Sequence, residues 1–379
     1  MTRFDDIRHY TDAEMLAALQ TIRQLPELRQ VAAYAFPDLT YDEFLALLDS
    51  ITSIADLQHR VMVPGMRTVI AKTISSFTFS GLENIHPSQA HLYISNHRDI
   101  VLDAYLLQFI LDTHGMPTTR ITFGSNLMKN PFLREAGLCN KMFRTERDPA
   151  KGGTSPTAKG FYAALSHLSD YINSSILNDN ESVWIAQRGG RTKDGHDATD
   201  PALLKMLGVA SPYPNIADAY ANLNIIPLSI SYEWEPCDCL KAVERCKTLD
   251  GKYVKAENED LISIVTGITQ QKGAVHLNIG KPISKEEISQ LPSSRNEFCD
   301  ALAALLDSRI NDGYRLSPNN LIAYDLLHQT NRFATRYTPA QVNQLSQRID
   351  TLLTQYPTLD PQTLRTYYLQ NYARTSIAD

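Results

Sequence analysis

The stretch His91-Leu92-Tyr93-Ile94-Ser95-Asn96-His97-Arg98-Asp99-Ile100-Val101-Leu102-Asp103 decides the fold of this chain. Its first five residues form a short apolar run of the kind that makes a buried strand, and the residues around Asp103 begin an apolar run typical of a helix. A helix that directly follows a buried strand is characteristic of an α/β layer fold. We therefore expect His97 at the mouth of a sheet, between the end of a strand and the start of a helix.

Outward from this stretch, short apolar runs alternate with helical stretches, as in other α/β folds. The change of character near Pro87 and the position of the last apolar run predict an α/β domain at residues 86–283. The candidate strands are residues 91–95, 120–124, 141–144, 182–187, 224–232 and 275–280.

Both flanks of this domain have a helical pattern. In residues 1–85, apolar side chains recur every three or four positions, for example at Met15, Leu19 and Ile22. After residue 284 the pattern becomes helical again. We predict a helical N-terminal segment at 1–85 and a helical C-terminal segment at 284–379.

The composition excludes several classes of protein. A chain of 379 residues with 43% hydrophobic residues can bury a substantial core, and its net charge of −6 argues against nucleic-acid binding. Five cysteines are too few for a disulfide framework at this length, which favours a reducing compartment. The first residues lack a secretory signal, and no stretch approaches the roughly 20 apolar residues of a membrane-spanning helix. We expect a cytoplasmic protein whose contact with the cytoplasmic membrane is peripheral.

Basic residues are concentrated in one part of the chain. Residues 129–159 contain seven basic side chains and three acidic ones. A local excess of this size favours binding of a small anion such as a phosphate, and a solvated surface is the alternative that charge alone leaves open.

His97 is the candidate general base. A general base takes the proton of an attacking hydroxyl group, and a neutral histidine suits this task near pH 7. A carboxylate behind the ring would fix its tautomer and stabilise the imidazolium. Asp99 and Asp103 are both within reach of the ring.

Together with three later blocks, this stretch resembles the phospholipid and glycerol acyltransferase family over roughly residues 80–235. The family's first block is a histidine, four residues and an aspartate, and here five residues separate His97 from Asp103. The resemblance implies that His97 is the base and that Asp103, which precedes a helix like that of the family, orients it. Asp99 is the second choice. The resemblance also implies a mixed sheet covered by helices.

The family's second block, a glycine followed by phenylalanine and arginine, is similar to residues 137–147 and implies that Arg144 and Arg147 hold the acceptor's phosphate. An arginine suits this role because its planar fork can make two charge-assisted hydrogen bonds to a phosphate. Arginines paired with neighbouring acidic residues at the surface are the alternative interpretation.

The third block resembles residues 184–193 and implies a phosphate-binding loop with Arg188, Gly190 and Arg191. Glycines let backbone N–H groups turn toward an anion. The family's glutamate is missing, because Arg188 or Gly189 stands in its place. An altered acceptor, a weakened enzyme and a degenerate site are all consistent with this departure.

The fourth block resembles residues 225–233, which implies that Pro227 and Glu233 shape the acyl-donor side. Without the other blocks, this string is a strand with a proline, which favours a strand start or an edge strand.

The resemblance implies an enzyme that moves a fatty acyl group from acyl-coenzyme A or acyl-carrier protein to a hydroxyl of glycerol-3-phosphate or a lysophospholipid. We expect no cofactor and no metal, because the cysteines near Cys237 lack a fourth ligand and a polar loop explains the acidic residues near Asp197. Two other functions stay open. One is a thioesterase or hydrolase in which His97 activates water, and the other is a non-catalytic lipid-binding relative, which the missing glutamate suggests.

Overall fold

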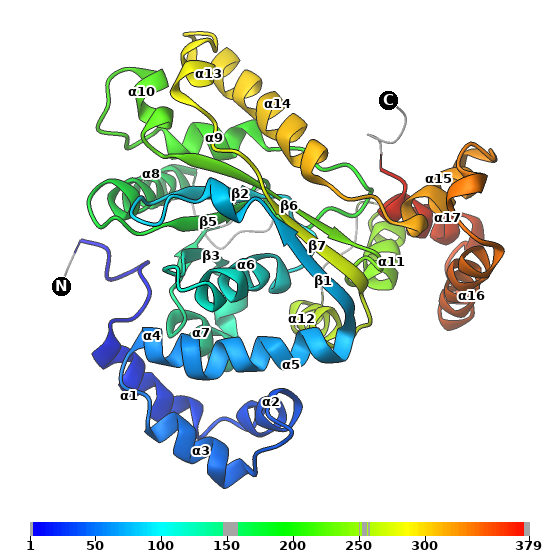
Figure 1. The fold of residues 1–379 in the computed structure, drawn as a ribbon, viewed down its shortest axis with the longest axis horizontal. Helices are drawn as coiled ribbons and strands as arrows, with labels where there is room; N and C mark the ends of the chain where they lie inside the picture. The colour runs from blue at the N-terminus through cyan, green and yellow to red at the C-terminus, as the bar shows by residue number, and fades with distance from the viewer. Residues whose placement is uncertain (1–2, 147–157, 250, 252–255, 257, 375–379) are drawn as a thin grey trace.

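The computed structural model describes residues 3–146, 158–249, 251, 256 and 258–374. In these residues, seven strands form one mixed sheet in the order β1-β7-β6-β2-β5-β3-β4 (Figure 1). The strands from β6 to β4 in this order are parallel, whereas β7 is antiparallel to β6 and parallel to β1. The predicted α/β fold with a mixed sheet is confirmed. The strands are β1 (Ile74–Ser80), β2 (Leu92–Ser95), β3 (Arg120–Gly124), β4 (Met142–Thr145), β5 (Val183–Ala186), β6 (Ile225–Tyr232) and β7 (Gly273–Ile279).

Helices cover both faces of the sheet, and each face has its own apolar cluster. On one face lie α5 (Val63–Thr73), α6 (Leu102–Thr113), α7 (Pro131–Leu138) and α12 (Glu259–Thr269). On the other face lie α8 (Ala158–Leu177), α9 (Pro201–Leu207), α10 (Ile216–Ala221), α13 (Lys285–Ser289) and α14 (Arg295–Gly313). Two short 3-10 helices lie in loops, η2 (Leu82–Asn84) and η3 (Leu127–Lys129).

The remaining helices of the two flanks form further helical units beside these layers, and α11 joins the C-terminal unit (Figure 1). The N-terminal unit has its own cluster around Met15, Phe44 and Leu48, and the C-terminal unit has one around Leu345 and Leu364. The first unit contains α1 (Asp12–Ile22), α2 (Glu27–Ala35), α3 (Tyr41–Asp49), α4 (Ile54–Leu57) and the π-helix η1 (Gln58–Met62). The second contains α11 (Asp238–Thr248), α15 (Pro318–His328), η5 (Ala334–Arg336), α16 (Pro339–Gln355) and α17 (Pro361–Tyr372). Among the described helices, none combines the length and the apolar character that crossing a bilayer requires.

The six predicted strands are present within two residues of their predicted bounds, but β1 was not predicted. The prediction that residues 1–85 are wholly helical is therefore wrong at residues 74–80. β1 is an edge strand whose one buried side chain is Ile74. An edge strand that buries so little shows only a weak alternation of apolar and polar residues.

β6 is an interior strand, so the expectation that its proline marks a strand start or an edge is wrong. The carbonyl of Pro227 accepts a hydrogen bond from the Gly280 N–H at 2.9 Å. The pairing of β6 with β7 extends only as far as Leu228 and Ile279, so the proline nitrogen faces the position where this ladder ends. The proline has no N–H to return a bond to Gly280, and the ladder between β6 and β7 ends at this point.

The carboxyl ends of three central strands meet at one edge of the sheet. β2, which is buried throughout, ends at Ser95 between its parallel neighbours β5 and β6. In parallel α/β sheets, ligands bind outside this edge. The fold thus brings His97 together with the segments that follow β5 and β6.

His276 on β7 predicts a loss of stability at acidic pH. Its ring lies 2.8 Å from the hydroxyl of Thr78 and 3.1 Å from that of Ser80, and burial lowers its pKa to about 4. Between pH 6.5 and pH 4 the unfolded chain binds a proton that the folded chain does not, so stability falls as the pH decreases through this window. We expect this group to account for about 1–3 kcal/mol of the loss.

The measurement is urea unfolding at pH 7 and pH 4.5 for the wild type, His276→Gln and, as a control, the exposed His59→Gln. His276→Gln should lose less stability than the other two proteins. An equal loss in all three would contradict the assignment.

Candidate active site

His97 directly follows β2, and its side chain is 15% exposed at the carboxyl edge of the sheet. Its Nδ1 lies 3.1 Å from Oδ2 of the fully buried Asp103. In a neutral ring that donates from Nδ1 to this carboxylate, the lone pair is on Nε2. Nε2 forms no hydrogen bond with the described residues. This geometry suits a general base and the carboxylate that orients it.

Asp103 is held in one orientation by donors from the same loop and from β6. Its Oδ2 also accepts the backbone N–H groups of Arg98 at 2.6 Å and Asp99 at 2.9 Å. Its Oδ1 accepts the Tyr232 hydroxyl at 3.0 Å. Burial, and then the charge of Asp103, raise the pKa of Tyr232 well above its ordinary value, so this hydroxyl keeps its proton and donates it.

Asp99 has a different place from Asp103. Its Oδ1 accepts the backbone N–H groups of Val101 and Leu102, both at 2.8 Å, and so stabilises the turn that leads into α6. Its Oδ2 is buried and has no hydrogen-bond partner. Burial, and then the neighbouring Asp103, raise the pKa of Asp99. Of the two candidate carboxylates, the structure places Asp103 against the His97 ring.

The loop after β5 is joined to the His97 segment. The Thr192 N–H donates to the carbonyl of His97 at 2.8 Å. Gly190 is exposed and has φ +84°, a left-handed conformation that favours glycine, and a side chain at Gly189 or Gly190 would point into open space. Arg188 is half-buried, and its guanidinium forms no ion pair or hydrogen bond with the described residues.

Arg191 points into the protein rather than toward solvent. Its side chain is buried, and Nη2 donates to the Ser263 hydroxyl on α12 at 3.1 Å. Nη1 is also buried and has no partner. The structure therefore brings Arg188 and Gly190 to the open side of this loop and places Arg191 under α12.

The second predicted arginine pair lies further away. Arg144 is on the edge strand β4, three strand spacings from β2, or roughly 14 Å across the sheet. Its side chain is exposed, and its Nε donates to Glu146 at 2.6 Å. Arg147 lies outside the described residues. Arg144 thus does not contact the His97 segment.

Pro227 and Glu233, which were predicted to shape the acyl-donor side, both make contacts within the sheet. Pro227 pairs with Ile94, below the carboxyl edge. Glu233 accepts the N–H of Ala274 through its side chain at 2.7 Å, beside the first residues of β7. The structure brings neither of them to the His97 ring.

A buried network of charged residues beside His97 was missed in the sequence. Arg98 is 1% exposed, and its Nη2 donates to Asp197 Oδ2 at 2.6 Å. Lys241 Nζ donates to the carbonyl of Arg98 at 2.7 Å and to Glu235 at 2.6 Å. Although burial acts in the opposite direction, the guanidiniums of Arg98 and Arg374 hold the pKa of Asp197 well below its ordinary value. The signal in the sequence was weak, because charged residues are normally at the surface.

The carboxylate of Asp197 binds two arginines, since its Oδ2 accepts from Arg98 and from Arg374. The described part of the chain contains no group of three or more His, Cys, Asp or Glu side chains that could share a metal ion.

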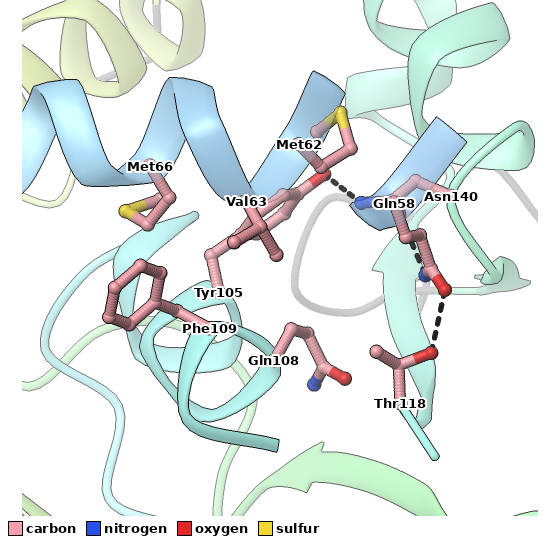
Figure 2. Close-up of a pocket in the computed structure, with 9 residues that line it drawn as sticks. All are labelled: Gln58, Met62, Val63, Met66, Tyr105, Gln108, Phe109, Thr118 and Asn140. Carbon is pink, nitrogen blue, oxygen red and sulfur yellow. Dashed lines mark hydrogen bonds between the residues drawn. The ribbon is translucent and has the colours of Figure 1, made fainter. Parts of the chain in front are cut away.

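A small pocket lies on the far side of α6 from the sheet, against α5 and η1 (Figure 2). Gln58 of the π-helix donates to Asn140 at 2.8 Å and accepts from Thr118 at 2.7 Å, and Asn140 donates to Tyr105 at 2.6 Å. None of the predicted site residues lines this pocket. The complete lining is Gln58, Met62, Val63, Met66, Tyr105, Gln108, Phe109, Thr118 and Asn140.

Comparison with known proteins bears on this site. A family model described as Acyltransferase matches residues 76–231, a span that contains His97, Asp103 and the loop after β5. The 1-acyl-sn-glycerophosphate (LPA) acyltransferase PlsC from Thermotoga maritima is a similar solved structure, with 12% identity and a TM-score of 0.40 over 79% of this chain and 95% of that chain. No protein of curated function matches. Residues 76–231 of this chain are therefore similar to the acyltransferase family.

Proposed function

We propose that this protein transfers a fatty acyl group from acyl-coenzyme A or acyl-carrier protein to a hydroxyl of glycerol-3-phosphate or a lysophospholipid. The observation that carries the proposal is the hydrogen bond between His97 Nδ1 and Asp103, which leaves Nε2 free to accept a hydroxyl proton. The family match supports acyl transfer as the reaction. Peripheral contact with the cytoplasmic membrane belongs to the proposal, because a lysophospholipid acceptor lies in a bilayer.

In the first step, His97 Nε2 takes the proton of the acceptor hydroxyl while its oxygen attacks the thioester carbonyl. Asp103 stabilises the imidazolium that forms. In the second step, the tetrahedral intermediate collapses, the carbon–sulfur bond breaks and the proton passes from Nε2 to the departing thiolate. The products are one ester and one free thiol, and His97 is neutral again.

Arg188 is the strongest candidate for holding the acceptor's phosphate. Its loop is bonded to the His97 carbonyl through Thr192, and its guanidinium forms no ion pair with the described residues. The exposed backbone at Gly190 can turn an N–H toward the same anion. Arg144 lies on β4, at a greater distance from His97. We propose Arg144 and Arg147 as outer contacts of the phosphate.

Replacing Arg188 with alanine is expected to raise the KM of the acceptor by roughly tenfold or more with a smaller change in kcat, because a charge-assisted contact to phosphate is lost. Arg144→Ala should have a smaller effect in the same direction. The measurement is steady-state kinetics with glycerol-3-phosphate and its lyso derivative as acceptors.

Arg134→Ala is the control matched to Arg144→Ala, because Arg134 is likewise exposed and paired with a nearby glutamate but lies on α7. It should leave the acceptor KM unchanged. If Arg188→Ala and Arg144→Ala also leave it unchanged, the assignment of the phosphate site is wrong.

A hydrolase is the alternative that the same geometry supports, since His97 and Asp103 can equally activate a water molecule. The test is thiol release from palmitoyl-coenzyme A with glycerol-3-phosphate, with its lyso derivative and without an acceptor. Release that depends on one acceptor supports the transferase and identifies that acceptor. Equal release in all three reactions would replace the proposal with a hydrolase.

A further inference from the structure

The C-terminal helical unit makes a direct connection to the active-site loop. α15, α16 and α17 pack with α11 at one end of the sheet (Figure 1). Two residues after the end of α17, the chain places Arg374 beneath the carboxyl edge, where the side chain is 1% exposed. A buried cation at this point needs a specific set of partners.

The partners of Arg374 fix its position on several sides. Nη1 donates to Asp197 Oδ2 at 2.7 Å, and Nη2 donates to Asn311 Oδ1 at 2.5 Å. Its guanidinium carbon lies 3.6 Å from the ring centroid of Tyr314, which is a cation–π contact. Asn311 and Tyr314 belong to the end of α14 and the residue after it. Arg374 therefore links Asp197 to α14, which covers the face of the sheet opposite to α6.

Two short routes lead from Asp197 to the catalytic pair. In the first, Asp197 accepts from the Arg98 side chain at 2.6 Å, and the Arg98 N–H donates to Asp103 at 2.6 Å. In the second, Asp197 accepts from the Thr192 hydroxyl at 2.8 Å, and the Thr192 N–H donates to the His97 carbonyl at 2.8 Å. Both ends of the hydrogen bond between His97 and Asp103 are thus positioned by groups bound to one carboxylate.

Arg374 can be removed without leaving a buried charge unpaired. Asp197 would still accept from Arg98 and from Thr192. The fold should therefore survive the substitution. The Asp197 carboxylate, however, would lose one of the donors that orient it, so its orientation should change. Small displacements of this kind in a catalytic pair have large effects on turnover.

We propose that Arg374 is a positioning residue for the catalytic pair, so that the C-terminal helices complete the active site in addition to packing on α11. The inference rests on the proposed role of His97 as the base. It assigns Arg374 no contact with substrate and predicts an effect on kcat rather than on KM.

The test compares Arg374→Ala, Arg374→Lys and Arg365→Ala in the full chain. Arg374→Ala should lower kcat by roughly 10- to 100-fold while both KM values stay near those of the wild type. Arg374→Lys should recover most of the activity, because an ammonium group can still donate to Asp197. Arg365→Ala removes an arginine of α17 that has no bond to Asp197 and should match the wild type.

A second readout does not depend on activity. The proton between His97 Nδ1 and Asp103 should give a downfield resonance in the proton NMR spectrum, identified by its absence in His97→Ala. In Arg374→Ala this resonance should shift or broaden, and in Arg374→Lys and Arg365→Ala it should remain.

The outcomes separate the two claims. An unchanged resonance together with an unchanged kcat in Arg374→Ala would overturn the positioning role, as would an Arg374→Lys variant as impaired as Arg374→Ala. A changed resonance in a protein whose wild type shows no His97-dependent transfer would support the positioning role and overturn the proposed function instead.

Discussion

Replacing His97 with alanine is expected to lower kcat for acyl transfer by roughly 10²- to 10⁴-fold while the protein stays folded. The ring is 15% exposed, forms one hydrogen bond through its side chain and lies edge-on to Trp184, so its loss costs some packing but breaks only that one hydrogen bond. Asp103 would still accept from Arg98, Asp99 and Tyr232, and no buried carboxylate would be left unpaired. Steady-state kinetics and a urea unfolding curve of the same preparation measure both parts of this prediction.

His59 provides a matched control within the chain. Its Nδ1 lies 3.0 Å from Asp112, in a histidine–aspartate pair like that of His97, but its side chain is 72% exposed and lies on η1. His59→Ala should keep the kcat of the wild type. Near-normal turnover in His97→Ala would exclude His97 as the base.

Replacing Asp103 with asparagine should also lower kcat by roughly 10²- to 10⁴-fold. The amide lacks the charge that stabilises the imidazolium. Both oxygens of Asp103 accept hydrogen bonds, so the NH₂ group of an asparagine would meet a donor whichever oxygen it replaces. Unfolding by urea should show whether the loss of turnover exceeds any loss of folded protein. The comparison with Asp99→Asn makes this experiment specific.

Asp99→Asn should retain turnover close to that of the wild type. An asparagine oxygen can still accept the N–H groups of Val101 and Leu102, and its NH₂ group takes the place of an oxygen that has no hydrogen-bond partner. Since burial, and then Asp103, raise the pKa of Asp99, a neutral amide is a close substitute. Equal loss in Asp99→Asn and Asp103→Asn would contradict the different roles assigned to them.

The junction of β2 and α6 was predictable from the sequence because local patterns determine it. A short apolar run marks the buried strand, and the helix follows within a few residues. The choice between Asp99 and Asp103 was not determined by spacing, since both lie near His97 in the chain. It depends on the turn into α6, in which Asp99 accepts the backbone N–H groups and leaves Asp103 to the ring.

The buried ionic network could not be predicted because its members are distant in the sequence. Arg98, Asp197 and Arg374 meet only through the packing of β2, the loop after β5 and the end of α17. General rules place charged residues at the surface, and an exception requires knowledge of the partner. The same limit explains why Arg191 was assigned to an open loop although the structure buries it under α12.

The roles predicted for Pro227 and Glu233 came from the resemblance of residues 225–233 to the family's fourth block. In the structure, both residues make contacts within the sheet. Pro227 lies in an interior strand, at the position where pairing with β7 ends, and Glu233 binds the backbone of Ala274. Their proposed place on the acyl-donor side stays a prediction, as do the roles of Arg144 and Arg147.

The central claim is tested most directly by the ratio of ester formed to thiol released. The wild type would be given a labelled palmitoyl thioester and saturating glycerol-3-phosphate or its lyso derivative, and both products would be counted in one reaction. We predict one ester on the phosphate-bearing acceptor for each thiol, with both products lost in His97→Ala. Thiol without ester would show a hydrolase, and neither product with either acceptor would contradict the assignment of an enzyme.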